Sequence, residues 1–161
     1  MKRILGIDPG LRFCGVGLIE VDGSNLRFLH SATIKPNTKV ELAERLLFLN
    51  QELAKIIEAY QPDEAALEET FVSQNGQSTL KLGQARGAIM LSLSQNGLRV
   101  NEYAARLVKK SITGSGAADK TQMMHMVKLL LPKSDAQTED EADALAIAST
   151  HEHHANNVIA A

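Results

Sequence analysis

An acidic residue at the end of an apolar strand is the feature that most constrains this chain. Residues 4–10, Ile-Leu-Gly-Ile-Asp-Pro-Gly, are typical of a buried strand that ends in a tight turn. Alternation along the strand places Asp8 on the same face as Ile4 and Gly6. An isolated ionised carboxylate in such a place is strongly unfavourable unless it is paired or bound to a metal ion. We therefore expect Asp8 to have such a partner.

Length and composition favour one domain over residues 1–161, with the last few residues frayed. The chain has 161 residues, of which 44% are hydrophobic, and contains no long polar tract. It has no apolar signal-peptide segment and no run of about 18 apolar residues, so we expect a cytoplasmic protein without a membrane span. The lone Cys14 allows no internal disulfide, and its strand-like surroundings favour a small buried apolar role.

Hydrophobic periodicity divides the chain into strands and helices in the order βββαβαβα. The first three strands form an antiparallel meander, and the later strands are separated by helices. This order predicts an α/β fold with a five-stranded mixed sheet flanked by helices on both faces. The expected strands are 2–8, 13–21, 26–34, 64–68 and 98–103, the expected helices are 40–60 and 79–95, and the remainder is largely helical.

Three further acids are candidate site residues alongside Asp8. Glu68 ends the fourth predicted strand after apolar residues, and residues 138–141 form a capping-box pattern that opens the last helix. Asp140 and Asp143 are three residues apart and therefore share one helix face. A first-turn acid such as Asp140 also suits the positive end of the helix dipole, and Glu68 alone also suits a solvated strand end.

If these elements converge, the acids require a cation. Two carboxylates 4 Å apart repel by about 4 kcal/mol at an effective dielectric constant of 20. Oxygen-only ligands suit Mg²⁺ or Mn²⁺ and argue against a structural zinc ion. The histidines show no ligand spacing, and His151, His153 and His154 lie near the terminus that we expect to fray.

Positive charge is concentrated in one segment, residues 99–133, although the net charge of the whole chain is -2. Residues 99–133 contain seven Lys and Arg against two acids, which leaves a local charge of +5. Such a segment either faces phosphate or merely solvates helix surfaces.

Four stretches together give this chain a resemblance to the RuvC family of Holliday junction resolvases. They are Gly-Ile-Asp-Pro-Gly at 6–10, Glu-Glu-Thr-Phe at 68–71, Leu-Lys-Leu-Gly-Gln-Ala-Arg-Gly at 80–87 and Glu-Asp-Glu-Ala-Asp-Ala-Leu-Ala at 139–146. The first stretch alone also resembles the phosphate loop of actin-like ATPases, but the combination favours the resolvases.

The resemblance implies a ribonuclease-H-like fold, a homodimer and Mg²⁺-dependent cleavage of four-way DNA junctions by paired nicks, in DNA recombination and repair. It also implies cooperation with the RuvA and RuvB branch-migration proteins. The residues that match the family's four catalytic acids are Asp8, Glu68, Asp140 and Asp143, and Lys109 and Lys120 match family lysines near DNA.

The acids suit phosphodiester hydrolysis on chemical grounds as well. Two metal ions about 3.5–4 Å apart activate a water molecule and stabilise the leaving oxygen. We expect Asp8 to bridge both ions, Glu68 to bind one, and Asp143 with Asp140 to bind the other. We also expect Lys110 to contact phosphate.

Two further residues are DNA-contact candidates. Phe71 follows the catalytic strand beside a polar loop, where it either stacks on an unpaired base at the crossover or folds back onto the core. Arg86 lies within the second predicted helix. Two other functions stay open: an actin-like ATPase or phosphotransferase that uses residues 8–10 at phosphates, and a resolvase-like module that binds junctions without cutting them.

Overall fold

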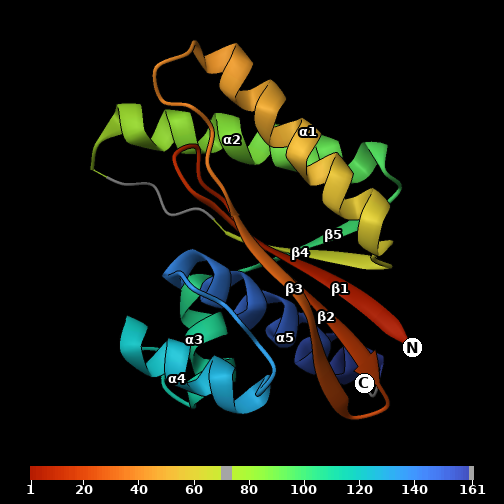
Figure 1. The fold of residues 1–161 in the computed structure, drawn as a ribbon. Helices are drawn as coiled ribbons and strands as arrows, with labels where there is room; N and C mark the ends of the chain where they lie inside the picture. The colour runs from red at the N-terminus through yellow and green to blue at the C-terminus, as the bar shows by residue number, and fades with distance from the viewer. Residues whose placement is uncertain (70–73, 160–161) are drawn as a thin grey trace.

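The N-terminal meander forms three adjacent strands of a mixed sheet whose strand order is β3-β2-β1-β4-β5 (Figure 1). The computed structural model describes residues 1–69 and 74–159, the last four of these by their backbone alone. β1 pairs antiparallel with β2 and parallel with β4. The strands are β1 (Lys2–Asp8), β2 (Cys14–Asp22), β3 (Asn25–Ile34), β4 (Glu64–Glu68) and β5 (Arg99–Tyr103). The helices are α1 (Leu42–Tyr60), α2 (Gly76–Gln95), α3 (Ala105–Thr113), α4 (Lys120–Leu130) and α5 (Glu139–Ile159).

The predicted five-stranded mixed sheet is confirmed, and the element boundaries differ by a few residues. α2 begins at Gly76, three residues before the predicted start. The reason is local, because the Asn75 side chain accepts hydrogen bonds from the backbone N–H groups of Gln77 (3.1 Å) and Ser78 (3.2 Å). The C-terminal third contains three helices, as its largely helical pattern predicts.

Each face of the sheet packs against its own helices (Figure 1). α1 and α2 cover one face, where Leu49, Leu53 and Ile89 contribute to a buried cluster that also contains Cys14. α3, α4 and α5 cover the other face, where the cluster includes Leu145. Cys14 is fully buried, and burial raises the pKa of its thiol to about 12, as suits an inert apolar residue. No helix in residues 1–69 and 74–159 has the length and apolar character of a membrane span.

A patch without side chains on β1 and β2 lets α5 lie directly on the sheet. Gly6 and Gly17 are register partners, and Gly15 lies opposite Asp8. A Cβ on Gly6 would lie 2.1 Å from the carbonyl oxygen of Ala144, and one on Gly17 would lie 2.6 Å from the backbone nitrogen of Leu145. These distances are too short for any side chain, so the close approach of α5 depends on glycine at these positions.

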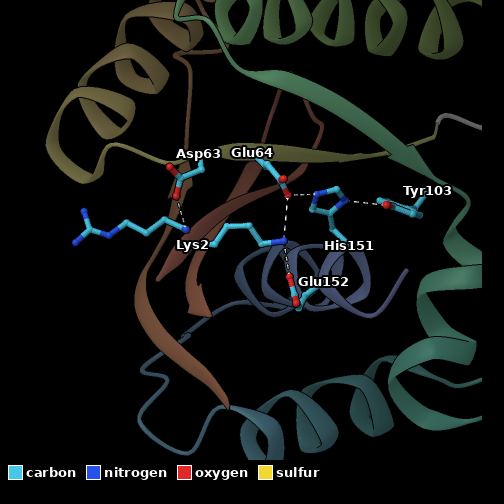
Figure 2. A network of polar contacts seen from close by, with 7 residues as sticks. Lys2, Asp63, Glu64, Tyr103, His151 and Glu152 are labelled. Atoms are coloured by element: carbon cyan, nitrogen blue, oxygen red, sulfur yellow. Dashed lines mark hydrogen bonds and ion pairs between the residues drawn. The ribbon is translucent and has the colours of Figure 1, made fainter. Parts of the chain in front are cut away.

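In its second half, α5 is fixed by a polar network (Figure 2). Buried His151 lies between the hydroxyl of Tyr103 on β5 (2.7 Å to Nδ1) and the carboxylate of Glu64 on β4 (2.8 Å to Nε2). Lys2 on β1 pairs with both Glu64 (3.4 Å) and Glu152 (2.7 Å). His151, for which the sequence gives no partner, is therefore held in the helix by this network.

We expect Gly6→Ala to destabilise the protein by about 3 kcal/mol or more, because the new methyl group must push α5 away from the sheet. Gly83→Ala on α2 is the matched control, since nothing lies within 4 Å of its added Cβ. That control should raise the free energy of unfolding by about 0.5–1 kcal/mol through helix propensity. Urea unfolding measures both changes, and equal stability of the two variants would contradict the packing argument.

Candidate functional site

The parallel pairing of β1 and β4 brings two of the predicted acids together. Ile7 and Leu67 are register partners, so Asp8 and Glu68 follow side by side at the carboxyl ends of their strands. Their carboxyl groups are joined by a hydrogen bond. Both side chains are partly exposed, whereas the residues before them are fully buried. The sheet thus presents two carboxyl groups at one edge.

The first two turns of α5 supply the other two acids. A Cβ on Gly15, the partner of Asp8, would lie 2.0 Å from the carbonyl oxygen of Asp140, so the backbone of Asp140 lies directly over this part of the sheet. Asp143 is one turn further along, and its charge and that of Asp140 both act on Asp8. The structure therefore brings together all four acids that the sequence singles out.

The start of α5 is held by a modified capping box. Thr138 accepts a hydrogen bond from the backbone N–H of Glu141 (3.2 Å), as the sequence pattern predicts. The Glu141 carboxylate, however, accepts from the backbone N–H of Gln137 (3.0 Å) and from the hydroxyls of Ser31 (3.0 Å) and Thr33 (3.3 Å) on β3. These bonds tie the helix start to the edge strand and so fix the position of Asp140.

Burial and mutual repulsion perturb the acids strongly. Burial raises the pKa of Asp8 from its ordinary 3.8 to about 8, and the negative charges of Glu68, Asp143 and Asp140 add to the shift. Burial likewise raises the pKa of Asp143 to about 6, with Glu68 as the next cause. Strongly perturbed carboxyl groups in one cluster mark a functional site. Without a bound cation, the Asp8 carboxyl group is therefore largely protonated near neutral pH, and it donates a hydrogen bond to the Glu68 carboxylate.

Two predicted lysines lie beside this cluster. Burial raises the pKa of Glu68, and the hydrogen bond from Asp8 and the charge of Lys109 on α3 both oppose that shift. Lys120, the first residue of α4, bonds to Glu139 at 2.5 Å, and its charge lowers the pKa of Asp143. The pKa of Lys120 itself is raised, chiefly by Glu139, so this side chain stays cationic.

The remaining DNA-contact candidates have different surroundings. Lys110 is exposed on α3. Arg86 forms an ion pair with Glu102 that joins α2 to β5, so its guanidinium already has a partner within the protein. Phe71 lies outside the described residues, and its predicted role stays a prediction.

The donor set fits a hard divalent cation. All four acids offer oxygen ligands, and their shared negative charge disfavours ionisation without a counter-charge. No three His, Cys, Asp or Glu side chains in the described residues lie in one ready-made ligand set. The fit therefore rests on donor chemistry and charge, and an ion would have to draw these side chains closer together.

Sequence reasoning missed residues that position the acids. Only the structure revealed the following: the role of the glycines of β1 and β2, the contacts of Glu141 with Ser31 and Thr33, and the Lys120–Glu139 pair. Glycine inside a strand often marks the close approach of another backbone, so Gly6, Gly15 and Gly17 did indicate such a contact in the sequence. The polar contacts join residues more than 100 positions apart or on separate helices, and no local pattern reveals them.

A mixed five-stranded sheet with carboxylates on its two central strands and on a crossing helix defines a ribonuclease-H-like nuclease. The model of the family Crossover junction endodeoxyribonuclease RuvC matches residues 4–151. This chain belongs to that family.

Individual relatives agree with this assignment. The chain is 55% identical to the crossover junction endodeoxyribonuclease RuvC of Rhodopseudomonas palustris strain TIE-1, with 94% of this chain and 87% of the relative covered. It is also 55% identical to that of Xanthobacter autotrophicus, with 94% and 90% covered. The solved structure of T. thermophilus RuvC in complex with Holliday junction substrate has a TM-score of 0.91 and 30% identity, and the match covers 98% of this chain and 97% of that one.

We expect Asp8→Asn to stabilise the protein in the absence of divalent metal, and increasingly so as the pH rises. A carboxyl group whose pKa is raised on folding stabilises the fold below its unfolded pKa, and this contribution is lost as the pH rises towards the folded pKa of about 8. Asparagine keeps the neutral form, so the gain in stability should grow steadily from about pH 5 to pH 8.

Thermal melts in EDTA between about pH 5 and pH 8 measure the difference between variant and wild type. Lys39→Ala, an exposed substitution outside the cluster, is the control and should show no trend with pH. A constant difference across the range for Asp8→Asn would show that ionisation of Asp8 does not oppose folding.

Proposed function

We propose that this chain is a crossover junction endodeoxyribonuclease that resolves four-way DNA junctions by hydrolysing one phosphodiester in each of two strands. The observation that carries the proposal is the convergence of Asp8, Glu68, Asp140 and Asp143 at one edge of the sheet, with lysines beside them. Membership of the RuvC family supports the junction as the substrate. Recombination and repair are the processes in which such an activity acts.

RuvC-family nucleases depend on a metal, and we propose that Mg²⁺ serves here, with Mn²⁺ as a substitute. Two ions per subunit suit the four acids: Asp8 would hold both, Glu68 one of them, and Asp143 with Asp140 the other. When bound, such ions activate water and neutralise charge on the reacting phosphate. This assignment rests on the donor chemistry and charge of the cluster.

The protein's own side chains then orient and neutralise the DNA. Lys120 lies beside Asp143 with its ammonium group held by Glu139, so it is placed to stabilise negative charge on the scissile phosphate. Because Lys120 stays protonated, it acts as a charge and not as a base. Lys109 contributes a second charge beside Glu68, and exposed Lys110 contacts the backbone further out. Arg86 would reach DNA only by releasing Glu102.

We further propose that residues 1–161 act as one nuclease domain within a homodimer. Two opposed nicks need two active sites, and a two-fold axis places them symmetrically on a symmetric junction. Phe71 would separate or stack bases at the crossover, and the RuvA and RuvB proteins would be partners in the cell.

The direct test is incubation of a mobile four-way junction with the protein and Mg²⁺. Wild type should give symmetric nicks that DNA ligase can seal, and Asp8→Asn should cut at least about a thousandfold more slowly while binding the junction, because only transition-state stabilisation is lost. Duplex DNA of the same sequence is the substrate control. Binding without cutting by wild type would indicate an inactive module, and ATP hydrolysis without nicking would indicate the actin-like alternative.

Lys120→Ala should slow single-turnover cleavage by about a hundredfold or more and leave junction affinity within a few fold, as expected for a charge that acts mainly in the transition state. Lys110→Ala is the matched comparison, since its exposed side chain should affect binding. That variant should reduce the dependence of affinity on salt by about one phosphate contact and cut normally once bound. The reverse ordering of the two variants would overturn both roles.

A further inference from the structure

An aromatic ring with two cations beside it lies at the same end of the sheet as the carboxylate cluster. We propose that Arg12, Phe13 and Lys35 form a DNA subsite, in which the ring stacks on an unpaired base and the two cations contact neighbouring phosphates. The inference rests on the proposed junction-cleaving function and assigns binding residues that lie outside the family's four matching stretches. For brevity, these three residues are called the Phe13 subsite.

The position of the Phe13 subsite follows from strand register. Asp8 pairs with Gly15 of β2, and Cys14 pairs with Ile34 of β3. Phe13 and Lys35 are the next residues beyond Cys14 and Ile34, so both project from the end of the sheet at which Asp8 lies. In the strand order, Glu68 is on the β4 side of Asp8 and the Phe13 subsite is on the β2–β3 side.

The exposure of Phe13 is built into a fixed loop. Within residues 11–14, Leu11 and Cys14 are buried, while the Phe13 side chain remains 43% exposed. A Cβ on Gly10 would lie 1.9 Å from the carbonyl oxygen of Phe13, and the Arg45 guanidinium donates to the Leu11 carbonyl at 2.9 Å. The ring therefore faces solvent because the loop directs it there, at the cost of the burial that a large apolar side chain usually gains.

Contacts within the protein leave the cations available. The guanidinium carbon of Arg12 lies 5.4 Å from the Phe13 ring centroid, and the Lys35 ammonium lies 5.9 Å from it. Such exposed cation–π contacts are worth only about 0.5–1 kcal/mol each. None of the ion pairs found in the described residues includes Arg12 or Lys35. Both can bind phosphate without breaking an ion pair.

The charge of the Phe13 subsite would help DNA to approach the acidic cluster. A cluster of four acids repels a DNA strand unless cations beside it offset the charge. Lys109 provides such charge beside Glu68 and Lys120 beside Asp143, and Arg12 and Lys35 provide it on the β2–β3 side of Asp8. A ring between two phosphate contacts is the arrangement by which proteins bind unstacked single-stranded nucleotides. The structure thus offers a strand a continuous path across the acids.

The test measures binding of a four-way junction, with the fluorescent base 2-aminopurine at the crossover, across a series of salt concentrations. All variants are made in the Asp8→Asn background so that cutting does not interfere. Phe13→Ala should weaken binding about fivefold or more at every salt concentration and reduce the fluorescence change, because stacking does not depend on released counterions. Phe13→Trp should retain both signals.

Arg12→Ala and Lys35→Ala should each lower the slope of log affinity against log salt by about 0.7–0.9, the value for one phosphate contact. Phe48→Ala and Lys39→Ala are matched controls: Phe48 is a similarly exposed phenylalanine on α1, and Lys39 is an exposed lysine. Both controls should bind like the parent. The melting temperature of each variant checks that it is folded.

Two outcomes separate failure of this inference from failure of the proposed function. If the parent binds junctions and wild type cuts them, but Phe13→Ala matches Phe48→Ala and the cation variants keep the parent slope, the Phe13 subsite does not exist. If neither the parent binds nor wild type cuts junctions, the proposed function fails, and this inference fails with it.

Discussion

The direct contact between α5 and the glycine patch on β1 and β2 is the constraint on which the rest of the structure depends. A helix packed on a sheet normally stands off by the length of the side chains between them. Gly6, Gly15 and Gly17 remove those side chains, so the helix backbone meets the strand backbone. This contact brings Asp140 and Asp143 close to Asp8, although more than 130 residues separate them from Asp8 in the sequence.

This packing works against electrostatic stability. The close approach concentrates carboxyl groups whose burial and mutual repulsion raise the pKa values of Asp8 and Asp143. Repulsion between these carboxyl groups would push α5 away from the sheet, and polar contacts at two places along the helix oppose this movement. Glu141 bonds to β3 at the start of the helix, and His151 bonds to β4 and β5 in its second half (Figure 2). Strain of this kind, offset elsewhere in the molecule, is common at functional sites.

Much of the fold was predictable because it depends on local pattern. Alternation fixed the meander, helical spacing fixed α1, and acids at the ends of apolar strands identified Asp8 and Glu68 as unusual. Their proximity needed one further step, the parallel pairing of β1 with β4. The sequence did not predict the Arg86–Glu102 pair or the burial of His151, since both depend on partners distant in the chain. His151 stands in a polar segment close to the end of the chain, and its partners on β4 and β5 explain why it is buried.

The acids and the cations of the candidate site stand on different kinds of element. The acids stand on the sheet and on a helix locked to it, an arrangement that would suit the proposed divalent ions, whose ligands must be held within narrow distances. The cations stand on shorter elements and loops: Lys109 on α3, Lys120 at the first turn of α4, and Arg12 between β1 and β2. Long side chains on such elements can follow a DNA backbone whose path changes as the junction distorts. In the proposed function, acids held on rigid elements and cations on more adaptable ones would together suit a flexible, highly charged substrate that is cut at one bond.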